Sequence, residues 1–138
     1  MNWLQPASLP VFTDWSAQAE ENVHADGVDT ITLDEARNHF TNQTAIFLDA
    51  RPEDAYSLGH IKGALNLPAN DIDARYADVL AVIDPEAVII TYCDGKACRL
   101  SADLAKFMKS DGFDRVQVLV DGWSLWNKSG LPVEENEG

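Results

Sequence analysis

Short apolar runs alternate along the chain with longer segments in which apolar residues recur every three or four positions. Runs that are apolar along their whole length are typical of strands buried on both faces of a sheet. The clearest of them lies between Pro85 and Gly95, two residues that commonly bound a strand. We expect strands at residues 30–32, 45–48, 65–67, 87–92 and 116–120.

The segments between these runs carry signals for helices. Thr32, followed three residues later by Glu35, forms a capping-box pattern, and Pro52 suits the first position of a short helix. Gly112 is a typical stop after a helical pattern. The expected helices cover residues 32–40, 52–56, 71–80, 100–111 and a segment after Gly122 that bears Trp123 and Trp126.

Strands that alternate with helices predict an α/β fold with a mostly parallel central sheet and helices on both of its faces. In such a sheet the binding crevice lies beyond the carboxyl ends of the strands. Three expected strands end at polar or reactive residues, so one rim can bring these residues together. They are Asp49 and Arg51, then Cys93, and then Asp121 and Gly122.

The segment around Cys93 is the strongest candidate for chemistry. An expected strand ends at Cys93, a polar loop follows, and a helix begins near Ser101. The first N–H groups of a helix and its dipole stabilise an anion, and Lys96 and Arg99 add positive charge, so a nucleophilic thiolate is favoured here. The alternative is that Cys93 is a small core residue at a strand end.

Three further motifs resemble those of the rhodanese-like sulfurtransferase domain, in the order typical of that family. They are residues 48–52 (LDARP), residues 59–68 (GHIKGALNLP) and residues 120–126 (VDGWSLW) with 130–133 (GLPV). The resemblance spans about residues 30–133. It implies a rhodanese-like domain over residues 30–138, preceded by an arm or linker at residues 1–29.

The resemblance also implies an activity, which is transfer of a sulfane sulfur through a persulfide on Cys93. The donor would be thiosulfate or another small anion, or a low-molecular-weight or protein persulfide, and the acceptor would be a thiol. No cofactor is implied. The substrate-binding loop would comprise Asp94, Gly95, Lys96, Ala97, Cys98 and Arg99, with Arg99 and Lys96 binding the donor and Asp49, Arg51 and His60 supporting the site.

The loop departs from the family pattern in two ways. Asp94 follows the cysteine where the family usually has a basic residue, which opposes thiolate formation and repels a dianion. The spacing Cys-x5-Arg from Cys93 to Arg99 is that of cysteine phosphatases and arsenate reductases. A phosphatase or arsenate reductase, a dithiol oxidoreductase that uses Cys93 with Cys98, and a non-catalytic binding module therefore stay open as alternatives.

Cys98 is a candidate resolving thiol. A loop that curls around an anion can bring it within disulfide distance of Cys93. Cys98 would then attack the persulfide and release sulfide, or close a disulfide that protects Cys93 from overoxidation. The alternative places Cys98 in the first turn of the following helix, pointing into the core.

Composition narrows the choice of partners. The 138 residues carry a net charge of −13, which argues against nucleic acid or an anionic membrane surface as a partner. Residues 93–109 are an exception, with four basic and two acidic residues, and suit an anionic substrate. Two neighbouring cysteines without His or carboxylate residues at ligand spacing predict neither a disulfide framework nor a metal site.

No apolar run approaches the length of about 18 residues that a membrane span requires, and the N-terminus lacks the pattern of a signal peptide. We expect a soluble domain, cytoplasmic by default. Residues 1–29 contain Trp3, Phe12 and Trp15, and interfacial aromatic residues of this kind also suit a segment that follows a membrane anchor. A soluble piece of a larger membrane-anchored protein is therefore a second interpretation.

Overall fold

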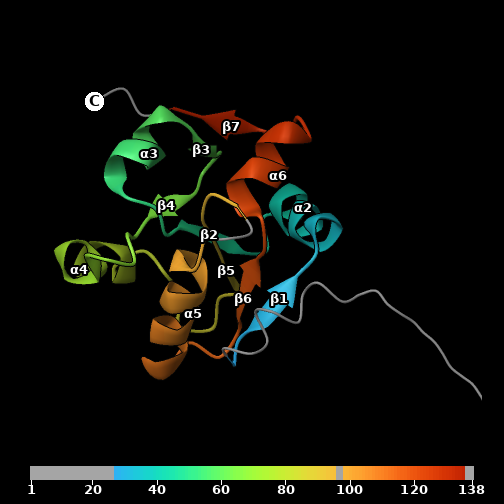
Figure 1. Ribbon diagram of the computed structural model, residues 1–138. Coiled ribbons are helices and arrows are strands. Elements are labelled where there is room, and N and C mark those ends of the chain that lie inside the picture. The colour runs from blue at the N-terminus through green and yellow to red at the C-terminus, as the bar shows by residue number, and fades with distance from the viewer. Residues whose placement is uncertain (1–26, 96–97, 136–138) are drawn as a thin grey trace, which may run out of the picture.

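The computed structural model describes residues 27–95 and 98–135 and shows a five-stranded sheet (Figure 1). The strands lie in the order β1-β6-β5-β2-β4, and every neighbouring pair is parallel. A second sheet pairs two short strands in antiparallel orientation. The strands are β1 (Asp29–Ile31), β2 (Ile46–Asp49), β3 (His60–Ile61), β4 (Leu65–Asn66), β5 (Ile89–Tyr92), β6 (Val116–Leu119) and β7 (Val133–Glu134).

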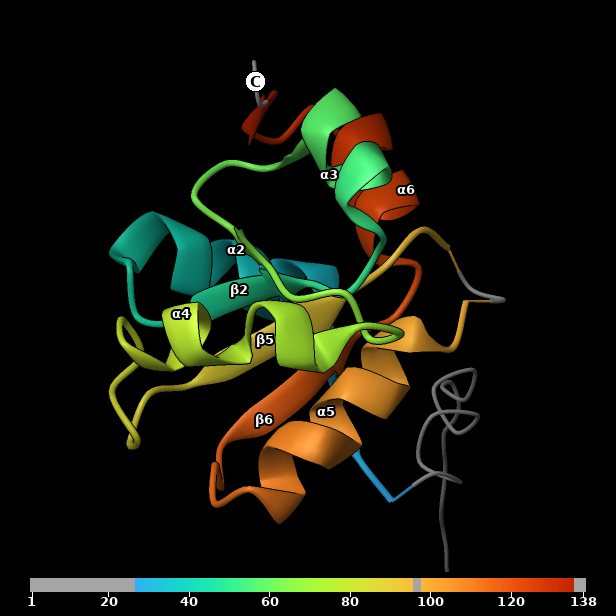
Figure 2. The ribbon, with the colours of Figure 1, turned by 90° about the vertical axis from the view of Figure 1, so that its left-hand side faces the viewer.

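Helices cover both faces of the five-stranded sheet, as the view in Figure 2 shows. One face packs against α4 and α5, and the other packs against α2 and α6. Residues of β5 alternate between these two cores: Ile89 lies on the α5 side and Ile90 on the α6 side. The helices are α2 (Leu33–Asn42), α3 (Glu53–Leu58), the 3-10 helix η3 (Ile72–Ala74), α4 (Tyr76–Leu80), α5 (Leu100–Ser110) and α6 (Gly122–Lys128).

The predicted α/β class and the mostly parallel sheet are confirmed, and several local signals act as expected. Both capping-box hydrogen bonds form at the start of α2: the Glu35 N–H donates to Thr32 Oγ1 at 3.1 Å, and the Thr32 N–H donates to Glu35 Oε1 at 3.2 Å. Gly112 follows α5 with a φ of 107°, a left-handed conformation that stops the helix.

The prediction of one amphipathic helix over residues 71–80 is wrong. At Arg75 the backbone leaves helical geometry, with φ of −128°, so the segment forms η3 and then α4. The turn between the two pieces lets Ile72, Tyr76 and Val79 all pack against one core. Arg75 itself is partly exposed and pairs with Glu53 at 2.6 Å. The pairing of β3 with β7 was not expected from the sequence.

The proposed arm at residues 1–29 lies outside the described residues up to position 26. Within the described part, Val28 is buried in the core and Asp29 begins β1. None of the helices in residues 27–95 and 98–135 is long and apolar enough to cross a membrane.

Candidate active site

The carboxyl edge of the sheet brings most of the expected site residues together. Asp49 ends β2 and lies opposite Tyr92, the last residue of β5, in the parallel register. Cys93 follows β5, and α6 begins where the chain turns after β6 (Figure 1). Three segments that are distant in the sequence therefore meet at one rim, as parallel strands dictate.

The first turn of α6 holds the beginning of the Cys93 loop. The Trp123 N–H donates to the Cys93 carbonyl oxygen at 2.8 Å, and the Ser124 N–H donates to the Asp94 carbonyl oxygen at 2.8 Å. Helix-start N–H groups lack partners within their own helix, so the loop backbone satisfies two of them. The path of the chain from Cys93 to Asp94 is therefore fixed by α6.

Gly122 makes this close approach possible. A Cβ atom at this position would lie 2.6 Å from the Tyr92 Cβ and 2.9 Å from the Cys93 carbonyl oxygen. Every other residue type would push α6 away from the end of β5. The sequence placed Gly122 at the rim, but the contact that requires glycine depends on two segments about thirty residues apart and leaves no local signal.

Cys93 and Cys98 are joined by a disulfide, with their Cα atoms 6.3 Å apart, within the usual range for a disulfide. Cys93 is buried, whereas Cys98 is partly exposed. Cys98 precedes α5 rather than lying in its first turn, and its N–H donates to the Gly95 carbonyl oxygen at 3.0 Å. The expectation that the loop curls far enough to bring the two cysteines together is met in this form of the protein.

Little space remains beside the disulfide. The cavity there has a volume of about 20 Å³ and is lined by Cys93, Cys98, Ser101 and Asp121 among others. That is room for about one water molecule. The cavity that the described residues form beside the disulfide is therefore too small for a thiosulfate-sized donor.

Arg51 makes several hydrogen bonds and contacts within the rim. Its guanidinium donates to both Asp49 carboxylate oxygens, at 2.7 and 3.0 Å, and to the Gly59 carbonyl oxygen at 2.6 Å. It also pairs with Asp94 at 3.3 Å and lies over the Trp123 ring, 4.9 Å from its centroid. Burial acts to lower the pKa of Arg51, but the Asp49 hydrogen bonds and charge outweigh it and raise that pKa. Through its contacts with Gly59, Asp94 and Trp123, Arg51 ties the end of β2 to other segments of the rim.

Asp94 is the residue whose charge was expected to oppose a thiolate at Cys93. Its side chain is 68% exposed and faces the Arg51 guanidinium. Arg51 therefore offsets part of the negative charge that Asp94 brings next to the cysteine. This contact explains how an acidic residue can follow Cys93 without a basic neighbour in the sequence.

His60 lies in β3 and contributes to the rim from one side. It is buried and stacks on Tyr56, with ring centroids 3.7 Å apart. Its Nδ1 lies 2.8 Å from the Tyr56 carbonyl oxygen, and its Nε2 lies 3.2 Å from Oε2 of Glu134 in β7. The hydrogen bond from the Gly63 N–H lowers the pKa of the Glu134 carboxyl, and the hydrogen bond and charge of His60 lower it further. Both ring nitrogens of His60 thus hold neighbouring backbone and β7 in place.

The remaining loop residues divide between described and undescribed positions. Gly95 lies near Asp121 and Ser124, and Arg99 is exposed at the start of α5. Lys96 and Ala97 lie outside the described residues.

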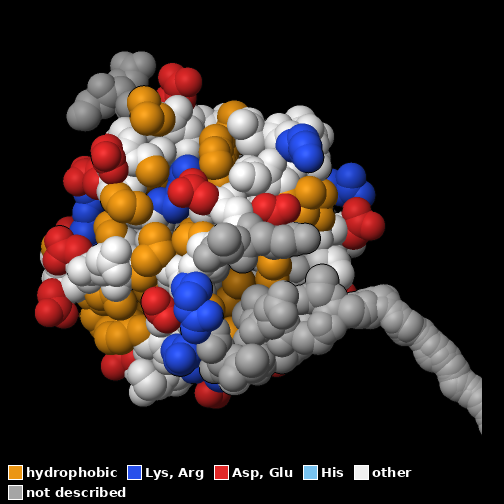
Figure 3. Space-filling model, viewed as in Figure 1, with side chains coloured by type: hydrophobic (Ala, Val, Ile, Leu, Met, Phe, Trp, Pro, Cys, Tyr) orange, Lys and Arg blue, Asp and Glu red, His pale blue; other side chains and the backbone are white. Residues whose placement is uncertain are grey.

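Among the described residues, no three His, Cys, Asp or Glu side chains come close enough together to hold a metal ion. On the face of the molecule that Figure 1 and Figure 3 show, acidic side chains are spread over the surface, with Lys and Arg side chains among them.

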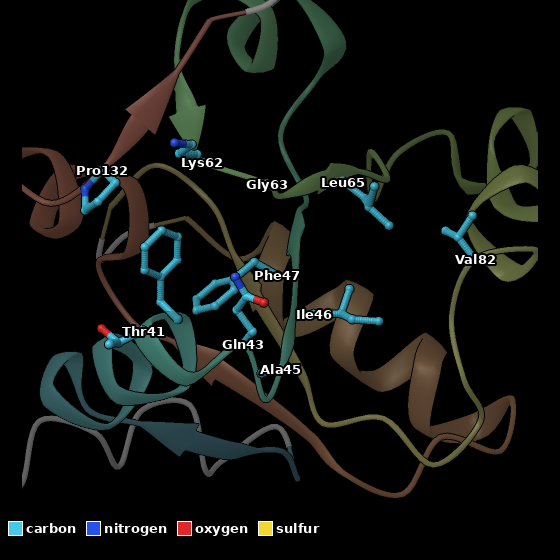
Figure 4. A pocket seen from close by; sticks show the side chains of 11 residues that line it. Thr41, Gln43, Ala45, Ile46, Phe47, Lys62, Gly63, Leu65, Val82 and Pro132 are labelled. Carbon is cyan, nitrogen blue, oxygen red and sulfur yellow. The ribbon is translucent and has the colours of Figure 1, made fainter.

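A larger hollow lies elsewhere, against the beginnings of β2 and β4 (Figure 4). Its volume is about 770 Å³, and apolar side chains such as Phe40, Phe47 and Val82 line much of it. Lys62 stands at its edge (Figure 4). The described residues of the Cys93 loop do not line this hollow. No cysteine or histidine is among its described lining residues.

Comparison with known proteins gives the same family for sequence and fold. The model of the rhodanese-like domain matches residues 32–129. The chain is 34% identical over 119 residues to the HTH-type transcriptional regulator Rv0324 of Mycobacterium tuberculosis, covering 86% of this chain and 50% of that protein. It therefore spans only half the length of that relative.

Two shorter relatives are matched over most of their length. Thiosulfate sulfurtransferase GlpE of Actinobacillus pleuropneumoniae serotype 7 is 33% identical over 94 residues, which are 67% of this chain and 81% of that protein. The crystal structure of the BH2092 protein from Bacillus halodurans superimposes with a TM-score of 0.69 and 28% identity, over 85% of this chain and 84% of that one. This chain belongs to the rhodanese-like domain family.

Proposed function

We propose that the protein is a sulfurtransferase in which Cys93 carries the transferred sulfur as a persulfide. The observation that carries the proposal is the position of Cys93, at the carboxyl end of the central strand β5 on a loop that α6 fixes. Membership of the rhodanese-like family supports it, as does similarity to proteins named thiosulfate sulfurtransferase.

In the proposed first step, the reduced Cys93 thiolate attacks the sulfane sulfur of the donor. With thiosulfate the S–S bond of the donor breaks, sulfite leaves with the electron pair, and a Cys93 persulfide forms. A thiol acceptor then takes the outer sulfur. Reduction of the disulfide must come first, because in the disulfide Cys93 has no thiol with which to attack a donor.

Arg99 is the proposed donor-binding residue among the described cations. It is exposed beside Cys98, just before the first turn of α5. Its guanidinium is always charged and offers a planar set of donors to a sulfonate or carboxylate. Arg51 is buried, donates to Asp49, Asp94 and Gly59, and is proposed to support the rim.

The test uses two matched variants, Cys98→Ser and Cys93→Ser, each fully reduced and then incubated with thiosulfate or with a low-molecular-weight persulfide. Cys98→Ser should gain about 32 Da, one sulfur atom, and lose it again to cyanide, whereas Cys93→Ser should gain nothing. Equal uptake by Cys93→Ser would refute the assignment. A parallel incubation with a phosphate ester analogue tests the phosphatase alternative, which requires a phosphoryl adduct on Cys93.

A dithiol oxidoreductase is a second candidate function, favoured by the Cys93–Cys98 disulfide. It predicts catalytic turnover of a disulfide substrate with a thiol reductant in the absence of any sulfane sulfur. Rates no faster than those of Cys98→Ser would remove this candidate.

A further inference from the structure

The two residues of the Cys93–Cys98 disulfide differ in exposure. Cys93 is 2% exposed, at the end of the central strand and packed in the core shared with α5. Cys98 is partly exposed in the loop before α5. Thiol–disulfide exchange requires a thiolate to approach the sulfur that it attacks, so access favours attack at Cys98.

A hydrogen bond between the Ser101 hydroxyl and the Cys93 sulfur also distinguishes the two sulfur atoms. Its buried hydroxyl lies 3.4 Å from Sγ of Cys93. A disulfide sulfur carries no proton, so the hydroxyl is the donor in this pair. The Thr91 hydroxyl donates to the Ser101 carbonyl oxygen at 2.9 Å and thereby anchors the first turn of α5 to β5. A donor held in this way stabilises negative charge on the Cys93 sulfur, which makes Cys93 the better leaving group.

We infer that Cys98 is a second nucleophile, that it discharges the Cys93 persulfide as sulfide, and that an external thiol then reopens the resulting disulfide at Cys98. The discharge step rests on the function proposed above. The direction of reopening, by which we mean attack of the external thiol on the Cys98 sulfur rather than on the Cys93 sulfur, does not rest on it. The disulfide in the structure is then a working intermediate of the reaction.

The atoms and electrons balance without an added oxidant. The Cys98 thiolate attacks Sγ of Cys93, the bond to the outer sulfur breaks, and that sulfur leaves with the electron pair as hydrosulfide. The two cysteines are oxidised to the disulfide while the sulfane sulfur is reduced. An external thiolate next attacks Sγ of Cys98, Cys93 leaves as a thiolate that accepts the Ser101 hydrogen bond, and a second thiol frees Cys98. The sum converts one sulfane sulfur and two thiols into hydrogen sulfide and one external disulfide.

The direction of reopening can be read from the oxidised wild type with glutathione as the probe thiol and excess iodoacetamide as the trap. Trypsin cleaves after Lys96 and therefore places the two cysteines in separate peptides. We expect glutathione on Cys98 and the alkyl group on Cys93. Glutathione mainly on Cys93 would overturn the inferred direction.

Ser101 is tested in the same assay as a positioning residue. Ser101→Ala should slow reopening about fivefold, the effect of losing a hydrogen bond worth about 1 kcal/mol. Ser101→Thr keeps a hydroxyl and should restore the rate. A rate for Ser101→Ala equal to that of the wild type would remove Ser101 from the step.

Discharge is tested in a single turnover without added thiol. Reduced wild type and Cys98→Ser are incubated with one equivalent of a low-molecular-weight persulfide, which leaves one equivalent of its thiol; the released sulfide is measured, and the small molecules are removed before the protein mass is determined. Wild type should release one equivalent of sulfide and end about 2 Da lighter than its reduced form, whereas Cys98→Ser should keep the added sulfur, about 32 Da. Cys98→Ala provides a second variant.

The two proposals fail in different ways in this experiment. If wild type and both Cys98 variants keep the sulfur equally, the inferred role of Cys98 is wrong and the proposed sulfurtransferase function stands. If no form takes up sulfur and none releases sulfide, the proposed function and the discharge step fail together. The reopening assay still decides the direction of attack in that case.

Discussion

Two arginines flank the Cys93 loop in very different surroundings. Arg51 is buried and donates to Asp49, Asp94 and the Gly59 carbonyl oxygen, so its charge and its hydrogen bonds serve the protein itself. Arg99 is exposed beside the loop at the start of α5. The difference teaches that positive charge near a cysteine does not by itself identify a substrate-binding group. Burial separates the cation that builds the rim from the cation that is exposed beside the loop.

The largest expected effect comes from removing the buried cation. Arg51→Met should lower the free energy of unfolding by about 3–5 kcal/mol, because the fully buried Asp49 carboxylate loses its partner. Denaturant unfolding measures this loss. The double variant Asp49→Leu/Arg51→Met should recover part of it, since no unpaired charge is left. A loss below about 1 kcal/mol in the single variant would show that the pair does not stabilise the rim.

The contact between α6 and the end of β5 should be the next most sensitive. Gly122→Ala should cost about 1–3 kcal/mol of unfolding free energy and reduce sulfur uptake by Cys93, because the added Cβ overlaps the Tyr92 Cβ and the Cys93 carbonyl oxygen. Asn127→Ala, an exposed position on the same helix, is the control and should stay within about 0.5 kcal/mol of wild type. Equal behaviour of the two variants would contradict the argument for Gly122.

The exposed cation should affect turnover and leave stability nearly unchanged. Arg99→Ala should reduce kcat/KM for an anionic sulfur donor at least tenfold, about 1.4 kcal/mol of transition-state stabilisation. Its unfolding free energy should move by less than about 0.5 kcal/mol. Lys106→Ala removes the same charge from an exposed position on α5 and controls for the overall field. If both variants lose activity equally, Arg99 is not a specific donor-binding residue.

The smallest effect is expected at Asp94, the exposed loop residue that pairs with the buried Arg51. Asp94→Asn breaks an ion pair whose acidic partner is 68% exposed, so unfolding free energy should change by about 0.2–1 kcal/mol. In the reduced Cys98→Ser background it should also speed alkylation of Cys93 at neutral pH, by about fivefold at most. Asp103→Asn, exposed in the first turn of α5, is the matched control. Slower alkylation would show that Asp94 does not oppose the thiolate.

Local patterns predicted the parts of the fold that local interactions determine. The capping box of Thr32 with Glu35 and the stop at Gly112 involve residues a few positions apart, and both appear as expected. The strand that precedes Cys93 was likewise evident from its unbroken apolar run. At the end of β2, Asp49 and Arg51 stand two positions apart and form an ion pair.

The features that escaped prediction depend on contacts between distant segments. The strands β3 and β7 have two residues each, too few to show a period, and they form only because distant segments pair. The approach of Asp94 to Arg51 likewise has no signature in either segment. The break at Arg75 follows from how Ile72 and Tyr76 reach a common core, which periodicity alone could not distinguish from one continuous helix.

The strand order has a consequence for how the chain folds. β1 stands at one edge of the sheet and pairs with β6, with Asp29 opposite Gln117. During synthesis β1 is therefore made before the central strands but gains its neighbour only after β6 has been made. Such non-local pairing slows folding, because a long loop must close before the contact forms. The same delay applies to the contact of α6 with Cys93, so the environment of the cysteine is completed only when nearly the whole domain has assembled.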